Sequence, residues 1–196
     1  MSNVLVPIAN CSEDIEAITI IDVLRRGGAD VTVASVHDFK QITTAFGNKL
    51  EADVLLTDVV DKQYDAIVLP GGMSGAEHFR DCALLIDMLE KHDIQGALLC
   101  AICASPAVVF GKHGFVVDKQ ATCYPGFEKD LTGAEYISDP DQSVVVDGNV
   151  ITSQGPATAM VFALSVLVNL EGYEAAQKVA DRLLCLNSNN KCDTAK

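Results

Sequence analysis

Continuous apolar runs alternate along this chain with segments whose apolar residues recur at helical spacing. The runs predict buried strands at Val4–Ala9, Val31–Val36, Ala66–Leu69 and Ala97–Ala101. The periodic segments predict helices at Glu13–Arg26, at Ala83–His92, directly after Cys103, at Pro156–Asn169 and at Tyr173–Leu186. Strands without a polar face, each followed by a helix, are typical of a mostly parallel sheet that helices cover on both faces. The predicted fold class is therefore α/β.

The remaining segments complete this pattern without adding a second domain. The turn Asp147-Gly148-Asn149 lies between the apolar runs Val144–Val146 and Val150–Thr152, which predicts a β-hairpin. Residues 39–62 are irregular and predict short strands and loops. A length of 196 residues suits one domain, which we place at residues 1–187, followed by a polar tail at 188–196.

Charge and composition argue against several classes of protein. The formal net charge is −13 and the sequence has no basic run, which argues against binding to nucleic acids or anionic membranes. The longest apolar stretch, Ala159–Leu170, is interrupted by Ser165 and is too short to span a bilayer. The amino terminus lacks the basic segment of a signal peptide, so we expect a cytoplasmic protein.

The seven cysteines do not predict a disulfide framework, because their number is odd and their spacing is irregular. Such cysteines suit a reducing compartment. Cys100 and Cys103 form the one closely spaced pair, and the four histidines are scattered, so the sequence offers no tetrahedral zinc site. We expect neither a metal ion nor a cofactor.

Cys103 is the first candidate for chemistry. It follows a predicted strand and precedes a helix that carries Pro106 in its first turn, where proline is tolerated. A thiol at a helix N-terminus is favoured as the thiolate by the helix dipole and the free backbone N–H groups. The alternative is that Cys103 is a small buried hydrophobic residue, as many cysteines are.

Two further turns are expected beside Cys103, because ligand sites of such sheets lie beyond the carboxyl ends of the strands. They are Asn10–Glu13, after the first strand, and Pro70-Gly71-Gly72, after Leu69. Backbone N–H groups of Gly72 and Ala104 are candidates for an oxyanion hole around Cys103. The alternative for the glycine pair is an ordinary turn.

Glu16 is the second candidate, because it falls inside an apolar arc of the first predicted helix. Burial raises the pKa of such a carboxyl group and makes it a proton donor or acceptor near neutral pH. The alternative is a solvated residue that only complements the helix dipole. The same helix is apolar on more than one stripe, which predicts a two-fold dimer through this helix, with Ile21 among the outward positions.

Four segments in this order resemble the ThiJ/PfpI superfamily, and within it the DJ-1 branch. They are VLVPIANCSEDIEAITIIDVLRRGG, PGGMSGAEHFRD, LLCAICASPAVV and TSQGPATA, and the similarity extends from about residue 3 to the last helix. The resemblance implies a flavodoxin-like three-layer sandwich and a homodimer with its site near the interface. It places the reactive cysteine at Cys103, its protonated partner at Glu16 and the oxyanion donors at the N–H groups of Gly72 and Ala104.

The sequence departs from this family at two positions near the site. Tyr124 precedes Pro125, where DJ-1 proteins often have histidine, and it is a candidate hydrogen-bond donor in place of that histidine. Ala104 follows the cysteine, where protease-like members have histidine, and the late His-x-Glu of glutamine amidotransferases is missing. Without a histidine base, we expect neither a protease nor an amidotransferase.

The resemblance implies a cysteine-dependent, cofactor-independent glyoxalase or deglycase. Such an enzyme acts on methylglyoxal, glyoxal and their thiol or amine adducts, and it protects against oxidative stress. The alternative is a redox sensor or chaperone that works through oxidation of Cys103 without turnover. Both functions use Cys103 and Glu16, and the sequence does not choose between them.

Overall fold

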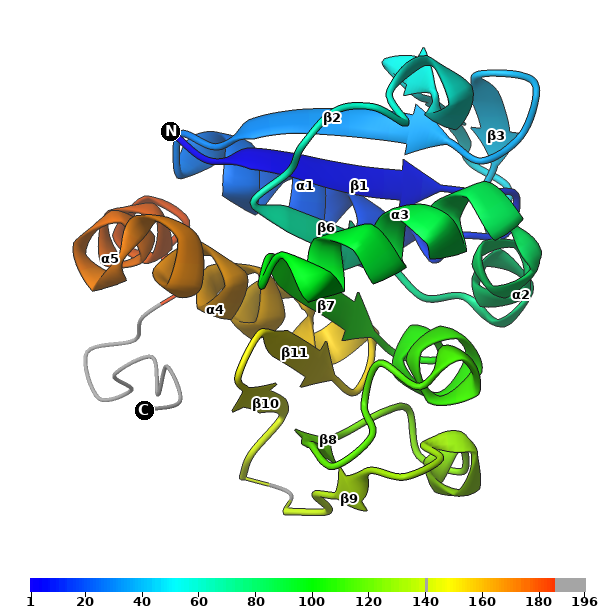
Figure 1. Ribbon diagram of the computed structural model, residues 1–196. Coiled ribbons are helices and arrows are strands. Elements are labelled where there is room, and N and C mark those ends of the chain that lie inside the picture. Colours follow the sequence, from blue (N-terminus) through cyan, green and yellow to red (C-terminus); the bar gives the residue numbers. More distant parts are fainter. Residues whose placement is uncertain (140, 186–196) are drawn as a thin grey trace.

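A seven-stranded sheet forms the centre of the computed structural model, which describes residues 1–139 and 141–185 (Figure 1). The strands are β1 (Asn3–Ile8), β2 (Asp30–Ser35), β3 (Gln41–Thr43), β4 (Lys49–Glu51), β5 (Val54–Leu55), β6 (Ala66–Leu69), β7 (Leu98–Ile102), β8 (Gln120–Ala121), β9 (Glu135–Tyr136), β10 (Val144–Asp147) and β11 (Val150–Ser153). The sheet order is β10-β11-β7-β6-β1-β2-β5, and every neighbouring pair is parallel except the antiparallel hairpin of β10 and β11. Both the mostly parallel sheet and the hairpin are as predicted.

Helices cover both faces of this sheet. They are α1 (Asp14–Arg26), α2 (Met73–Asp81), α3 (Ala83–Ile94), α4 (Ala159–Glu171) and α5 (Tyr173–Arg182), with short segments η1 (Leu56–Asp58), the π-helix η2 (Pro106–Gly111), η3 (Glu128–Asp130) and η4 (Pro156–Thr158). Side chains alternate along β1, so that Val4 and Val6 pack with α1 and α4, whereas Leu5 packs with α2, α3 and η2. Two apolar cores thus lie on the two faces of the sheet, which confirms the predicted flavodoxin-like three-layer sandwich.

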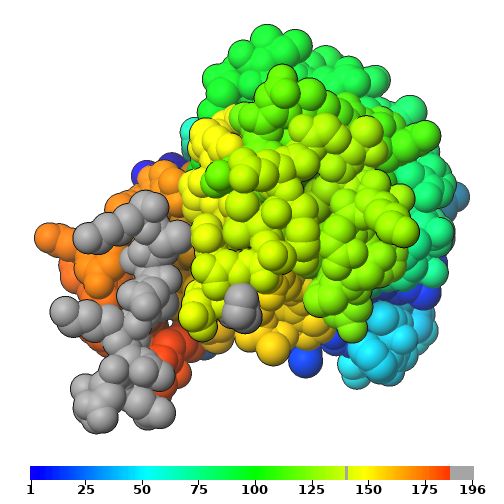
Figure 2. All heavy atoms as spheres, turned by 90° about the horizontal axis from the view of Figure 1, so that it is seen from below, coloured from blue at the N-terminus to red at the C-terminus, as the bar shows by residue number. Residues whose placement is uncertain are grey.

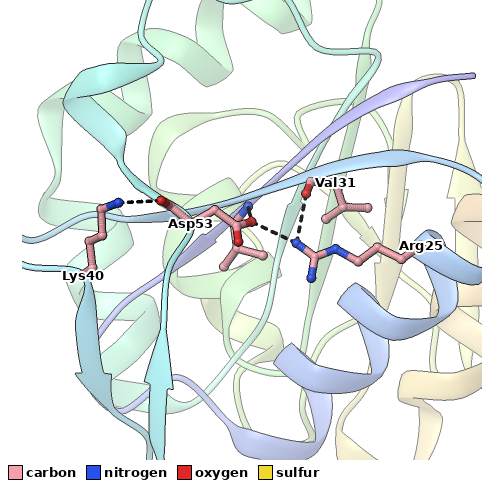
Figure 3. A network of polar contacts seen from close by, with 5 residues as sticks. Arg25, Val31, Lys40 and Asp53 are labelled. Atoms are coloured by element: carbon pink, nitrogen blue, oxygen red, sulfur yellow. Dashed lines mark hydrogen bonds and ion pairs between the residues drawn. The ribbon is translucent and has the colours of Figure 1, made fainter.

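A polar network fastens the β5 edge of the sheet to the first helix (Figure 3). The Arg25 guanidinium group donates to the carbonyl of Val31 at 3.1 Å and to the Asp53 carboxylate at 2.8 Å. The same carboxylate accepts the backbone N–H of Val33 at 3.0 Å, and Lys40 donates to the backbone carbonyl of Asp53 at 2.6 Å. These bonds fix the end of α1 against β2 and the edge strand.

The opposite edge of the sheet is covered by the chain between η2 and β10. Figure 2 views the molecule from this side, and the green-to-yellow segment that contains β8 and β9 occupies most of the visible face. The N–H of Thr122 donates to the Thr152 hydroxyl group at 2.9 Å, which ties this segment to β11. The segment thereby brings Cys123 and Tyr124 to the end of β7, where Cys103 lies.

Helix α2 is the main element that the apolar pattern does not predict. Its sequence contains Gly75, which weakens a helix interior, and few apolar positions. A Cβ atom at Gly75 would lie 2.9 Å from the backbone of Ser12. The close contact between α2 and the loop after β1 therefore requires glycine at this position, and a local propensity argument does not detect such a requirement.

Other boundaries differ by a few residues. Helix α5 ends at Arg182, before the predicted end at Leu186, which lies outside the described residues, as does the predicted tail at 188–196. The division into one domain at 1–187 and a tail therefore stays a prediction. Ile21, predicted to face outward, is 8% exposed, because it packs in the core between α1 and the sheet. Within the described residues, no helix is both long enough and apolar enough to cross a membrane.

Candidate active site

Cys103 lies on a sharp turn between β7 and η2. Its φ angle is 66°, in the left-handed region that residues with a side chain rarely adopt. Three hydrogen bonds hold this turn. The Cys103 N–H donates to the Ser153 carbonyl, and the Cys103 carbonyl accepts the Tyr124 N–H at 2.8 Å. The Ser105 hydroxyl group donates to the Pro70 carbonyl at 2.6 Å. Cys103 therefore lies on a sharp turn that leads from a strand into a helical segment, as the sequence predicted.

Glu16 lies in the first turn of α1 and is completely buried. Its Oε2 atom accepts the backbone N–H of Gly71 at 2.7 Å, while Oε1 is buried and has no hydrogen-bond partner among the described residues. Burial raises the pKa of the Glu16 carboxyl group to about 7; the Gly71 N–H acts in the opposite direction and the charge of Glu13 adds to the rise. The alternative of a solvated residue at the helix margin is therefore wrong.

The Cys103 thiol and the Glu16 carboxyl group lie close enough for each to shift the pKa of the other. Gly71 fills the space beside them. A Cβ atom there would lie 2.5 Å from the Cβ of Cys103 and 2.6 Å from Oε2 of Glu16. Because any side chain at this position would collide with both groups, glycine is required for the pair to exist.

Burial raises the pKa of the Cys103 thiol to about 12, and the negative charge of Glu16 adds to this rise. Hydrogen bonds from the backbone N–H groups of Gly72 and Ala104 act in the opposite direction. The net direction is the reverse of that expected from the helix N-terminus alone, because burial and the neighbouring carboxylate outweigh the backbone donors. Burial and the adjacent carboxylate therefore favour the neutral thiol of Cys103 over its thiolate.

Tyr124 lies at the rim of the site rather than inside it. Its side chain is 45% exposed, and its ring packs edge-to-face on Phe127 at a centroid distance of 6.3 Å. The backbone N–H of Tyr124 supports the Cys103 turn, and the predicted role of its hydroxyl group stays a prediction.

The structure thus brings together four of the five predicted site residues, with Tyr124 at the margin. Sequence reasoning did not identify the N–H of Gly71 as the partner of Glu16, nor the side chain of Glu13, which caps α1. The two adjacent glycines were the sequence signal for the Gly71 N–H, and an acidic residue at the start of the helix was the signal for the Glu13 cap. In residues 1–139 and 141–185, no group of three His, Cys, Asp or Glu side chains is arranged to hold a metal ion.

Comparison with known proteins identifies the family of this chain. Protein DJ-1 homolog B of Arabidopsis thaliana is 44% identical over 181 residues, which are 92% of this chain but only 41% of that protein. Glutathione-independent glyoxalase DJR-1.2 of Caenorhabditis elegans is 37% identical over 177 residues, 89% of this chain and 91% of that protein.

A solved structure shows the same fold. Oxidized Toxoplasma gondii DJ-1 superposes with a TM-score of 0.90 and 44% identity, over 94% of this chain and 98% of that one. The sequence pattern of the DJ-1/PfpI family matches residues 2–169. With its strained cysteine turn, buried glutamate and flavodoxin-like sheet, this chain belongs to the DJ-1/PfpI family.

Proposed function

We propose that this protein is a cysteine-dependent, cofactor-independent glyoxalase and deglycase that acts on methylglyoxal, glyoxal and their thiol or amine adducts. The observation that carries the proposal is the buried Glu16 carboxyl group beside the Cys103 thiol. Its pKa of about 7 suits a group that must both give and take a proton at neutral pH. The name of the Caenorhabditis elegans relative, a glutathione-independent glyoxalase, supports the same class of reaction.

In the first half of the proposed reaction, the Cys103 thiol transfers its proton to the Glu16 carboxylate. The thiolate sulfur then forms a bond to the aldehyde carbon, and the carbonyl oxygen becomes an alkoxide. The N–H groups of Gly72 and Ala104 stabilise the negative charge of this oxygen. Glu16 returns its proton to the oxygen, which leaves a neutral hemithioacetal on Cys103.

In the second half, the Glu16 carboxylate removes the hydrogen of the former aldehyde carbon as a proton, and the electron pair moves toward the adjacent ketone. After a proton passes between the two oxygens of the resulting enediolate, Glu16 protonates the ketone carbon and leaves a thioester of a 2-hydroxy acid. Water hydrolyses this thioester and frees Cys103. The sum is methylglyoxal plus water to lactate, which requires no oxidant or reductant. With an amine or thiol adduct, the Cys103 sulfur forms its bond to the former aldehyde carbon as the bond from that carbon to the amine or thiol breaks, and the proton that Glu16 took from Cys103 passes to the leaving group.

The proposal is tested with purified protein free of metal ions and added thiols, incubated with methylglyoxal while lactate is quantified. Cys103→Ser is expected to abolish turnover, because a serine hydroxyl group without a base is a poor nucleophile. Glu16→Gln is expected to lower turnover by about 100-fold or more, since an amide does not carry a proton between atoms. Cys82→Ser, a cysteine between α2 and α3, is the matched control and should retain activity. Absence of lactate with the unmodified protein would refute the proposal.

The second candidate function is a redox sensor or chaperone. Cys103 is 9% exposed, so a small peroxide has some access to its sulfur. Two equivalents of peroxide oxidise a thiol to a sulfinate and release two of water, and the N–H groups of Gly72 and Ala104 are donors for the sulfinate oxygens. This candidate is favoured over the first if peroxide oxidises Cys103 stoichiometrically while methylglyoxal is not turned over.

We also propose that the protein is a homodimer that associates through α1. Ile15 and Ile18 on this helix are 57% and 50% exposed, and Phe46, at the tip of the loop between β3 and β4, is 79% exposed. The Asp14 carboxylate accepts the N–H of Phe46 at 3.1 Å and so fixes that loop beside α1. Three large apolar side chains near one another on a surface are typical of an interface between subunits.

A further inference from the structure

A second buried carboxyl group, that of Glu13, lies beside Glu16 and has no part in the reaction proposed above. The residue is 6% exposed, which is uncommon for glutamate. Its Oε2 atom accepts the backbone N–H of Glu16 at 2.7 Å and thereby caps α1. Its own backbone N–H donates to the carbonyl of Gly71 at 3.0 Å. Glu13 therefore contacts both the catalytic candidate and the glycine that binds it.

These contacts form a closed ring of three hydrogen bonds. The Gly71 N–H donates to the Glu16 carboxyl group at 2.7 Å, and the Glu16 N–H donates to the Glu13 carboxyl group. The Glu13 N–H donates to the Gly71 carbonyl and closes the ring. The ring joins the start of α1 to the turn after β6. Because no side chain fits at Gly71, this ring determines how close the Glu16 carboxyl group lies to Cys103.

We infer that Glu13 is a positioning residue for Glu16: it fixes the Glu16 carboxyl group beside Cys103 and supplies negative charge that favours a proton on Glu16. After burial, the charge of Glu13 is the further cause that raises the pKa of Glu16. The one other titratable group facing Glu16 within the described part of the chain is the Cys103 thiol. The use of Glu13 in catalysis rests on the proposed function, but its effect on Glu16 can be measured without turnover.

Asp14 provides a matched control in the same turn. Its carboxylate accepts from the Thr44 hydroxyl group and the Asn48 amide at 2.5 Å each, and from the N–H of Phe46 at 3.1 Å. All three donors lie on the loop between β3 and β4, so the Asp14 side chain is directed away from Glu16. A neutral residue at 14 removes one negative charge from the start of α1 without breaking the ring.

The experiment measures the rate at which iodoacetamide alkylates Cys103 at pH 5 to 9, read at the Cys103 peptide by mass spectrometry. In the unmodified protein the rate should rise with an inflection near pH 7, because loss of the first proton leaves one proton shared between Glu16 and Cys103. In Glu13→Gln, which keeps a hydrogen-bond acceptor but loses the charge, the inflection should move to lower pH by on the order of one unit. Asp14→Asn should leave it in place.

Two outcomes would overturn the inference: an inflection that Glu13→Gln does not move, or one that Asp14→Asn moves equally. Glu13→Asp retains both the charge and an accepting oxygen, so its inflection should remain near that of the unmodified protein; a shift as large as that of Glu13→Gln would also contradict the inference. Methylglyoxal turnover is recorded separately. Loss of turnover in all proteins together with these shifts would reject the proposed function and leave the role of Glu13 standing.

Discussion

Replacing Glu16 by glutamine should change how protein stability depends on pH. The pKa of the Glu16 carboxyl group is about 7 in the folded protein and 4.5 as its ordinary value. Below pH 4.5 the group is protonated in both the folded and unfolded states, so it adds no pH dependence. Between pH 4.5 and 7 the unfolded chain loses this proton and the folded protein keeps it, so stability falls as pH rises. Above pH 7 the full penalty is reached, about 3 kcal/mol at about 1.4 kcal/mol per pKa unit.

Glutamine is neutral at every pH and can still accept the N–H of Gly71, so the variant lacks this penalty. Urea unfolding followed by circular dichroism, at one protein concentration, gives the free energy of unfolding for both proteins at pH 4.5, 6 and 8. The free energy of unfolding of Glu16→Gln minus that of the unmodified protein should increase by about 3 kcal/mol between pH 4.5 and pH 8. Glu90→Gln, on the exposed side of α3, should show no such shift. If this difference in the free energy of unfolding stays constant within about 1 kcal/mol across the three pH values, the claim that Glu16 is buried with a raised pKa is refuted.

Three further changes test other parts of the structure. Gly71→Ala should abolish turnover while destabilising the protein by about 1–3 kcal/mol, because the new Cβ would lie 2.5 Å from the Cβ of Cys103; an active, stable variant would contradict this packing. Ile18→Asp should yield monomers in sedimentation velocity at micromolar concentration, whereas Ile94→Asp, at a side chain that is 86% exposed on α3, should not; equal behaviour of the two would argue against a dimer through α1. Ser105→Ala should lower the free energy of unfolding by about 1–3 kcal/mol in urea titrations, since its buried carbonyl partner is left unpaired, and an unchanged midpoint would count against that bond.

Much of the fold could be predicted from the sequence, because the inner strands of the central sheet, such as β6 and β11, are buried along their whole length. Continuous apolar runs such as Ala66–Leu69 have no other stable location, and the observed β6 has the predicted bounds. The helix α2 could not be predicted, because Gly75 is required by a contact with Ser12 that is distant in sequence. Tertiary contacts of this kind override local propensity.

The site was predictable to a similar extent. Glu16 stood out because it falls inside an apolar arc, with burial and a solvated position at the helix margin as the two alternatives, and Cys103 because it follows a buried strand directly. The direction of the Cys103 pKa could not be predicted from the helix N-terminus, since burial and the Glu16 charge depend on packing between α1 and the end of β7. The ring through Glu13 likewise joins two segments whose approach only the fold determines.

The most direct test of the central claim is the fate of the aldehyde hydrogen when the protein converts methylglyoxal in D2O. In the proposed reaction Glu16 holds this hydrogen as a proton during the enediolate stage, and in one further step that proton exchanges with D2O past the slightly exposed Cys103 before the neighbouring carbon is protonated. Proton NMR of the product should therefore show lactate with deuterium at C2, formed by the unmodified protein and not by Glu16→Gln or Cys103→Ser. Lactate that retains hydrogen at C2, or no lactate at all, would contradict proton transfer by Glu16 on a substrate bound to Cys103.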